Sequence, residues 1–295
     1  MTKDGILTSE LDDAGTIDEA VEAASGDTPD DEFDESDEFD DNDESAEFDE
    51  FDVTDIDEAR REDDDADDDD VDLELVVLDM AGTTVVDDGL VEKAFVRAAE
   101  EAGIGKTPQE REDALQYVRD TMGQSKIAVF RSLADDEDQA QHANAVFENA
   151  YAQSVKAEGA TAVPGAEDVI GLLRDAGVKV ALTTGFSPST AQAIIGALQW
   201  EDLVDVVLSP ADAGRGRPFP DLPLTALLRT GATSVESMVV VGDTASDMAS
   251  GIAAGAGLVV GVLTGAHDEA TLSDAGADAV IGSIAELPAL LGFDD

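Results

Sequence analysis

The chain has 295 residues, no cysteine and a formal net charge of −54 at pH 7. The length allows one or two domains with a substantial core, and the lack of cysteine excludes disulfides, cysteine-ligated metals and thiol nucleophiles. So acidic a protein is not expected to bind nucleic acid phosphates. No apolar run reaches membrane-spanning length and no stretch resembles a signal peptide, so we expect a cytoplasmic protein that does not bind membranes.

Residues 1–70 form an acidic leader that holds 34 of the 70 acidic residues but only 3 of the 16 basic ones. Apolar residues are sparse there and follow no regular period, so the segment cannot bury enough surface to offset its ordering entropy. We therefore predict that the leader is disordered. Its phenylalanines, which recur in DEFD-like repeats, are either a docking motif for a partner or, in the interpretation we prefer, part of a solvated tail.

The remaining 225 residues still carry 36 acidic and 13 basic side chains, a net charge of −23. Such self-repulsion weakens a compact fold in dilute buffer, but the screening length falls to about 3 Å near molar salt. Few lysines and many small residues also fit a high-salt cytoplasm. We predict a halophilic protein that loses structure on dialysis to low salt.

A first strand is predicted at Leu73–Leu78, where a nearly continuous apolar run is typical of a strand buried on both faces of a parallel sheet. Asp79 follows directly, and a turn containing Gly82 comes next. Ligands bind at the carboxyl ends of strands in open α/β sheets, so Asp79 is a candidate site residue. A strand that simply ends in a polar residue has the same pattern. We expect Asp87 and Asp88, in the linker that follows, to hydrate the surface.

Residues 89–163 have helical periodicity and no strand-like runs. The pattern predicts a first helix ended by Gly103, a second opened by Pro108, and two more at Ser125–Leu133 and Asp136–Glu158. This all-helical insertion follows the first strand and would cover its carboxyl end as a cap.

From residue 164 onward, helices and strands alternate, which implies right-handed βαβ units. The fold class is therefore α/β, with a Rossmann-like parallel sheet, helices on both of its faces, and a core domain formed by 71–88 and 164–295. The predicted helices are Ala166–Gly177, Pro188–Leu198, about Asp221–Arg229 and Ala245–Ala254, and the strands are Val178–Thr184, Val204–Ser209, Met238–Val241, Leu258–Leu263 and Ala279–Ile281.

Three further polar clusters follow predicted strands: Thr183–Gly185, Gly216–Asp221 and Gly242–Asp247. Taken singly, each has a structural explanation, as a turn with a helix N-cap, a proline-rich loop and a capped helix start. The carboxyl ends of parallel strands meet at one sheet edge, however, so the clusters and Asp79 would gather there. Their order along the chain favours a shared site.

With these motifs in their order, the sequence resembles the haloacid dehalogenase (HAD) superfamily of Mg²⁺-dependent phosphoryl-transfer enzymes. The resemblance covers Leu73 to about Gly265, with the helical insertion in the position of that superfamily's cap. Within it, DMAGTT, TTGF, GRPFPD and GDTASDM look like the branch that contains phosphonoacetaldehyde hydrolase and its phosphonatase-like relatives.

The resemblance implies catalytic roles for residues of these motifs. Asp79 would be the nucleophile that becomes an aspartyl-phosphate. Thr184 and Gly185 would bind the phosphoryl group, and Arg217 would neutralise it where most of the superfamily has a lysine. Arginine suits this role because its guanidinium offers a fixed fork of donors to phosphoryl oxygens.

The resemblance also implies a Mg²⁺ site. Its ligands would be Asp79, the main-chain carbonyl of Ala81 and Asp243, with Asp247 supporting or sharing that role. Carboxylate and carbonyl oxygens suit a hard cation, and a carboxylate that attacks a negatively charged phosphoryl group needs one.

Most phosphatases of the superfamily have an aspartate at the position of Ala81, and that aspartate protonates the leaving group. This chain differs, because an alanine side chain cannot transfer a proton. The phosphonatase branch shares this loss and uses a cap lysine that forms a Schiff base with the substrate aldehyde. Lys126, in the segment TMGQSKI, falls on that position, and the alternative is a solvated helix lysine. Two departures from that branch are Val129, in place of a histidine, and Phe186, in place of a tyrosine.

We therefore expect a hydrolase that acts on a small organophosphonate or phosphate ester through an aspartyl-phosphate, with Mg²⁺ as its cofactor. Two alternatives stay open: an ordinary phosphatase of the phosphoglycolate or sugar-phosphate type, and a catalytically idle scaffold whose acidic leader binds a partner. The expected ligand is a small phosphorylated or phosphonate substrate, and a homodimer formed through the cap stays open as well.

Overall fold

The computed structural model describes residues 72–293, so the predicted acidic leader lies outside the described residues. The described part contains a six-stranded parallel sheet in the order β3-β2-β1-β4-β5-β6. This order places β1 inside the sheet, hydrogen-bonded to β2 on one side and to β4 on the other. The strands are β1 (Leu75–Asp79), β2 (Lys179–Thr183), β3 (Val206–Leu208), β4 (Met238–Gly242), β5 (Leu258–Val262) and β6 (Ala279–Ile281).

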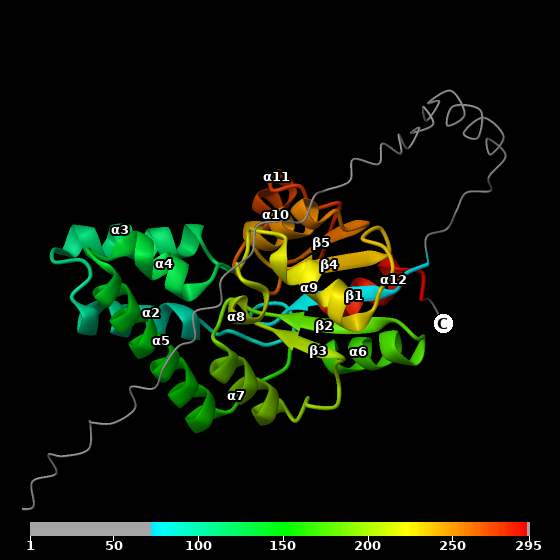
Figure 1. Ribbon diagram of the computed structural model, residues 1–295, viewed down its shortest axis with the longest axis horizontal. Coiled ribbons are helices and arrows are strands. Elements are labelled where there is room, and N and C mark those ends of the chain that lie inside the picture. Colours follow the sequence, from blue (N-terminus) through cyan, green and yellow to red (C-terminus); the bar gives the residue numbers. More distant parts are fainter. Residues whose placement is uncertain (1–71, 294–295) are drawn as a thin grey trace, which may run out of the picture. The chain divides into compact units, whose positions relative to one another are not determined.

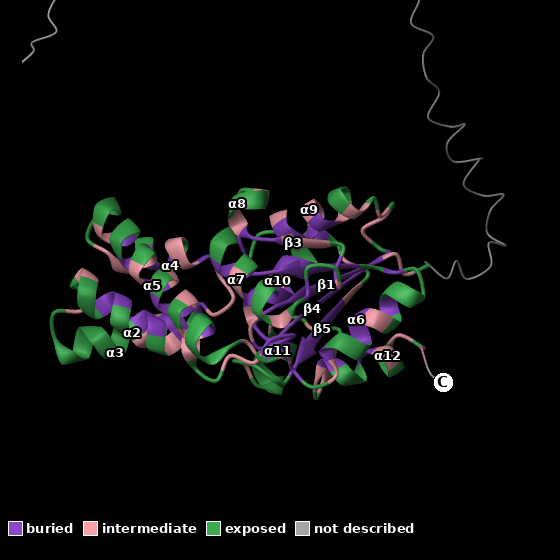
Figure 2. Cartoon of the chain, turned by 90° about the horizontal axis from the view of Figure 1, so that it is seen from below, coloured by how far each residue is buried: buried purple, intermediate pink, exposed green. Residues whose placement is uncertain are grey.

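Helices cover both faces of the sheet (Figure 1). Alternate residues of a strand point to opposite faces, so Leu75 and Val77 of β1 face one helical layer and Val76 faces the other. Figure 2 shows the strands buried between helices whose outer faces are exposed, which confirms the predicted Rossmann-like fold. The first layer contains α9 (Asp221–Thr230), α10 (Ala245–Ala254) and α11 (Glu269–Asp274), and the second contains α6 (Ala166–Asp175), α7 (Pro188–Leu198) and α12 (Leu287–Leu290).

The observed elements follow the predicted ones closely. Helices α7 and α10 have the predicted bounds, and β2 is one residue shorter than predicted at each end. The short helix α8 (Pro210–Ala213) was not predicted, although Ser209 and Asp212 form a capping box at its start. None of the helices between residues 72 and 293 is long and apolar enough to cross a membrane.

Four helices between β1 and α6 make up the segment that we call the insertion (Leu90–Glu158). Aromatic rings join three of them: Phe95 of the first helix stacks on Phe130 of the third at 5.4 Å between ring centroids, and Phe130 meets Phe147 of the fourth edge-on at 6.0 Å. In Figure 1 the strand arrows point towards the insertion, which therefore lies at their carboxyl ends. Its status as a separate cap domain, 89–163, stays a prediction. The helices are α2 (Leu90–Ala102), α3 (Pro108–Asp120), α4 (Lys126–Leu133) and α5 (Glu137–Glu158).

Local sequence explains where the helices of the insertion begin and end. Gly103 ends α2 in the left-handed conformation, with φ of 73°, which glycine adopts without strain. Thr107 starts α3 through a capping box with Glu110, and Asp136 caps α5. Because these signals act within a few residues, the sequence predicted all four helices of this segment.

Candidate active site

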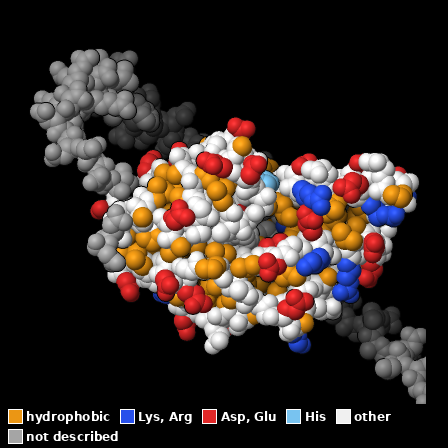
Figure 3. All heavy atoms as spheres, turned by 180° about the vertical axis from the view of Figure 1, so that it is seen from behind, with side chains coloured by type: hydrophobic (Ala, Val, Ile, Leu, Met, Phe, Trp, Pro, Cys, Tyr) orange, Lys and Arg blue, Asp and Glu red, His pale blue; other side chains and the backbone are white. Residues whose placement is uncertain are grey.

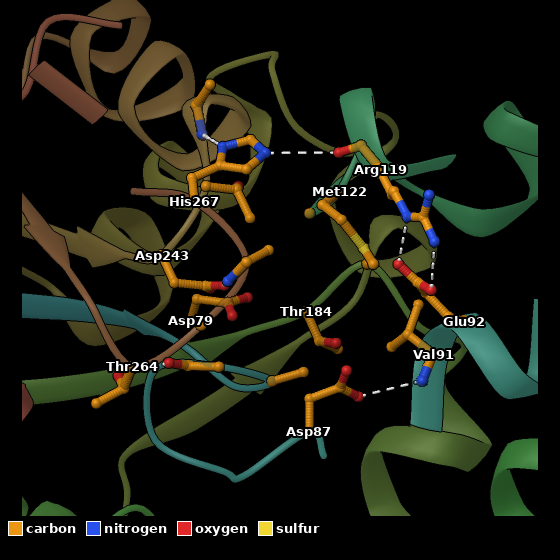
Figure 4. Close-up of a pocket in the computed structure, with 18 of the residues that line it drawn as sticks. Asp79, Asp87, Val91, Glu92, Arg119, Met122, Thr184, Asp243, Thr264 and His267 are labelled. Atoms are coloured by element: carbon orange, nitrogen blue, oxygen red, sulfur yellow. Dashed lines mark hydrogen bonds and ion pairs between the residues drawn. The ribbon is translucent and has the colours of Figure 1, made fainter. Parts of the chain in front are cut away.

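Residues that are far apart in the sequence meet where β1, β2 and β4 end. Asp79 is the last residue of β1, Thr183 is the last of β2, and Asp243 follows β4 directly. Because β1 pairs with both neighbours, the three strand ends lie side by side. They border a cavity of about 640 Å³ between this edge of the sheet and the insertion (Figure 4).

The cavity brings together nearly all of the residues that the motifs predicted. Asp247 does not line the cavity itself. It contacts Arg217, and Arg217 does line the cavity. The predicted residues that line the cavity are Asp79, Ala81, Thr184, Gly185, Arg217 and Asp243 from the core, and Lys126 from the insertion.

Arg217 binds two buried carboxylates. Its Nη1 lies 2.5 Å from Asp79 Oδ1 and 2.7 Å from Asp247 Oδ1, and its Nη2 donates a hydrogen bond of 3.2 Å to Thr183 Oγ1. Only 4% of Arg217 is exposed, so water screens these charges weakly. The guanidinium is thereby held beside Asp79, where it would meet a phosphoryl group attached to that carboxylate.

Asp243 is held by the loops that follow β1 and β5. Thr83 Oγ1 donates a hydrogen bond of 3.2 Å to its Oδ1, and the N–H of Ala266 donates one of 2.8 Å to its Oδ2. A Cβ atom added at Gly82 or Gly265 would collide with this carboxylate, and Gly82 also has a φ of 94°. Glycine at both positions therefore lets the two loops close around Asp243.

Asp247 lies in the first turn of α10 and forms a capping box with Thr244. The N–H of Thr244 donates to Asp247 Oδ2 at 3.1 Å, and the N–H of Asp247 donates to Thr244 Oγ1 at 3.2 Å. Its other oxygen faces Arg217. Both oxygens of Asp247 therefore have protein partners, and the start of α10 fixes the guanidinium in place.

Burial makes two carboxylates of this cluster, Asp79 and Asp243, hard to ionise. It raises the pKa of Asp79 to about 6, while Arg217 opposes the rise and the charge on Asp247 adds to it. Burial, together with the charges of Asp79 and Asp247, raises the pKa of Asp243 well above its usual range. Three buried carboxylates face one guanidinium here, so the cluster has an excess of negative charge when ionised.

A divalent cation fits this cluster. Asp79, Asp243 and Asp247 each offer a carboxylate oxygen, and these three atoms lie within 4.8 Å of one another. Mg²⁺ prefers oxygen ligands, usually carboxylates, and would balance the excess negative charge. The residues present therefore suit the predicted metal.

The predicted phosphate-binding residues lie where the core touches the insertion. The Thr184 hydroxyl accepts a hydrogen bond of 3.2 Å from the N–H of Phe186, and the N–H of Lys126 donates one of 3.2 Å to Gly185 O. A Cβ atom added at Gly185 would collide with the main-chain oxygen of Gln124. Glycine therefore allows the two main chains to meet at this point.

Lys126 begins α4, and its side chain lines the cavity. Its Nζ lies 5.5 Å from the ring centroid of Phe186, a cation–π contact. Burial lowers the pKa of Lys126, and the negative charge of Asp79 opposes the lowering. A lowered pKa increases the fraction of neutral amine, which is the form that attacks a carbonyl group.

Several charged and polar residues of the cavity were not predicted. Asp87, which we expected to hydrate the surface, is half-buried and lines the cavity. Arg119 Nε donates to Glu92 Oε1 at 2.8 Å across two helices, and His267 also lines the cavity. Arg119 and Glu92 lie 27 residues apart, so no local motif marks the pair.

Comparison with known proteins agrees with this geometry. Residues 73–255 match the family model of haloacid dehalogenase-like hydrolases. Phosphonoacetaldehyde hydrolase from Bacillus cereus is 30% identical over 210 residues, which covers 66% of this chain and 78% of that protein. The enzyme of the same name from Bacillus anthracis is 29% identical over 215 residues, with the same 66% and 78% coverage.

Solved structures show the same relationship. A phosphonoacetaldehyde hydrolase-like protein from Oleispira antarctica has a TM-score of 0.64 at 25% identity and covers 75% of this chain and 92% of its own. A hydrolase from Pseudomonas syringae has a TM-score of 0.66 at 23% identity, with coverage of 75% and 98%, which shows a shared fold. Together, these similarities confirm the resemblance that the four sequence motifs indicated.

Proposed function

The chain belongs to the haloacid dehalogenase-like hydrolase family, and on that premise we propose that it is a Mg²⁺-dependent hydrolase of a small organophosphonate or phosphate ester. One observation carries the proposal: the Asp79 carboxylate lines the cavity beside Arg217 and Asp243. A buried carboxylate next to a guanidinium and further carboxylates suits nucleophilic attack on phosphorus.

In the proposed reaction, an oxygen of Asp79 forms a bond to phosphorus while the bond to the leaving group breaks. Arg217, 2.5 Å from Asp79 Oδ1, and Thr184 would orient the phosphoryl oxygens. Mg²⁺ held by the carboxylate cluster would reduce the repulsion between the nucleophile and these oxygens. Water then hydrolyses the acyl phosphate, which releases phosphate and restores the carboxylate.

A phosphonate that carries an aldehyde is the substrate class we favour. Ala81 has no group that could protonate a leaving oxygen, whereas Lys126 lies in the same cavity as Asp79. An imine between Lys126 and the aldehyde would accept the electron pair of the phosphorus–carbon bond as it breaks, so no acid at position 81 would be needed. The relatives named phosphonoacetaldehyde hydrolase support this class.

A phosphate ester is the second candidate, and two side chains near Lys126 favour it. Val129 and Phe186 stand where resemblance to the phosphonatase branch implied a histidine and a tyrosine, and both are buried. Neither side chain transfers a proton. In an ester hydrolase, another cavity residue or water would protonate the leaving oxygen.

Phosphate release in molar salt, from phosphonates and from phosphate monoesters, tests the proposal. We expect turnover that requires Mg²⁺ and that falls by about 10³-fold or more in Asp79→Asn, because the nucleophile is lost. Asp113→Asn, at an exposed position of α3, is the matched control and should keep wild-type activity. Retained activity in Asp79→Asn would contradict the proposal.

Borohydride trapping separates the two substrate classes. With phosphonoacetaldehyde, a reduced adduct on Lys126 would support the phosphonate route. Turnover of a phosphate monoester without any adduct would support the ester route instead.

A further inference from the structure

Asp87 is a cavity carboxylate that the proposed reaction does not yet use. It lies between the turn after β1 and the start of α2, and its side chain is half-buried. The N–H of Val91 donates a hydrogen bond of 3.2 Å to Asp87 Oδ1, which holds the carboxylate at the cavity wall (Figure 4). Asp79 and Lys126 line the same cavity.

Two other half-buried carboxylates already have strong partners: Glu148, whose charge acts on Lys126, and Glu92, which lines the cavity. Glu148 accepts hydrogen bonds from the Ser187 hydroxyl at 2.6 Å and from the Thr190 hydroxyl at 2.5 Å. Glu92 accepts from Arg119 through both of its oxygens, at 2.8 and 3.1 Å. Asp87 has no ion-pair partner among residues 72–293. Of these three carboxylates, it is therefore the one that is free to exchange a proton with a group in the cavity.

Asp87 and Lys126 are close enough to affect each other's ionisation. Burial raises the pKa of Asp87, and the charge of Lys126 opposes the rise. Burial lowers the pKa of Lys126, and the charges of Asp79 and Asp87 oppose that lowering. Burial thus moves the pKa values of the acid and the amine towards each other, which favours proton transfer between them.

We propose that Asp87 is a further catalytic residue, the carboxylate that exchanges protons with Lys126 and with the substrate carbonyl oxygen while the imine forms. This inference rests on the carbonyl route of the proposed function. Asp87 takes a proton from the Lys126 ammonium, and the freed amine adds to the carbonyl carbon. The nitrogen-bound proton passes to the carbonyl oxygen, giving a neutral carbinolamine.

Protonated Asp87 then gives its proton to the carbinolamine hydroxyl, the carbon–oxygen bond breaks, and water leaves. The nitrogen lone pair forms the carbon–nitrogen double bond, which leaves a protonated imine on Lys126. Ammonium and aldehyde have become iminium and water, and Asp87 is again a carboxylate. Protons and charge balance without any other reactant.

Acetaldehyde with borohydride in molar salt tests this role, because imine formation with this probe needs no phosphoryl transfer. Mass spectrometry would measure the rate at which Lys126 gains an N-ethyl group. We expect that rate to fall by about 10²-fold in Asp87→Asn, the typical contribution of one general acid–base group. Asp87→Glu keeps the carboxyl group and should recover part of the rate.

Asp113→Asn is again the matched control, since it removes one negative charge from an exposed position of the insertion. Its labelling rate should equal that of the wild type, and equal melting temperatures would show that all variants are folded. Labelling of Asp87→Asn at the wild-type rate would overturn the role of Asp87 alone. Absence of any adduct in the wild type would overturn both this role and the carbonyl route, while phosphate release with Mg²⁺ would still uphold hydrolysis through Asp79.

Discussion

Asp79 combines its proposed role as the nucleophile with a cost to stability. The residue is 5% exposed, and burial raises its pKa to about 6. A carboxyl group with a raised pKa binds its proton more tightly in the folded state than in the unfolded state. The contribution of Asp79 to the free energy of unfolding therefore falls as pH rises from about 4 to about 6, and it stays at its lowest value above that range. A bound cation would offset this cost.

We therefore predict that Mg²⁺ raises the melting temperature more at pH 8 than at pH 5. The shift at pH 8 should be about 5 to 10 °C when Mg²⁺ is near 100 times its Kd. Thermal unfolding at constant ionic strength, with potassium chloride in place of the magnesium salt as the control, would measure it. Equal shifts at the two pH values would contradict the prediction.

At the scale of elements, Glu148 joins the insertion to the core. This residue of α5 accepts a hydrogen bond of 3.1 Å from the N–H of Ser187, at the start of α7, in addition to the two hydroxyl donors there. The neighbouring Phe186 packs its ring on Tyr151 of α5, at 4.4 Å between ring centroids. Because Phe186 follows Gly185 directly, these contacts tie the position of the insertion to the loop that holds the predicted phosphate-binding residues.

Glu148→Gln should loosen this connection, because an amide has one acceptor oxygen where the carboxylate has two. We expect the free energy of unfolding to fall by about 1 to 2 kcal/mol, the scale of a lost hydrogen bond to a charged group. KM should rise because Lys126 is held less well over the core. Denaturant unfolding and steady-state kinetics would measure both.

Glu158→Gln, at the exposed end of α5, is the matched control for that change. It removes the same charge from the same helix without touching α7. Equal stability of the two variants would show that the connection to α7 contributes nothing measurable.

For the whole molecule, charge is the dominant feature. Outside the leader, the chain has a net charge of −23. Figure 3 shows acidic side chains spread over the visible face, while most of the basic ones lie over the insertion. Repulsion between these charges favours the unfolded state unless salt screens it, and the Debye length shortens from about 10 Å at 0.1 M to about 3 Å at 1 M.

We predict that transfer from molar salt to dilute buffer lowers the melting temperature by about 10 °C or more, which corresponds to a few kcal/mol. A melting curve that does not change with salt would remove the halophilic interpretation. A chain without residues 1–70 should show the same dependence, because the rest of the chain is itself strongly acidic. If that shortened chain also releases phosphate at the full rate, catalysis needs no leader, which argues against the scaffold alternative.

Much of the fold could be predicted from sequence because its signals are local. The start of α10, for instance, is marked by Thr244 and Asp247, which cap the helix within three residues of each other. The strand order was not predicted, since pairing between strands depends on contacts across the sheet. The candidate cluster around Asp79 could be predicted because parallel strands have their carboxyl ends at the same edge of the sheet. Four motifs that each follow a strand are therefore expected to lie close together.

The sequence by itself therefore determined the α/β class and most of the helices and strands, and it marked the motif residues as site candidates. Apart from Lys126, only the tertiary structure decided which side chains of the insertion and its linker join the cavity, and it placed Asp87 in the cavity wall and paired Arg119 with Glu92. The physical reason is that the orientation of α2 and α3 over the sheet is set by packing between helices. No residue's neighbours along the chain encode that orientation.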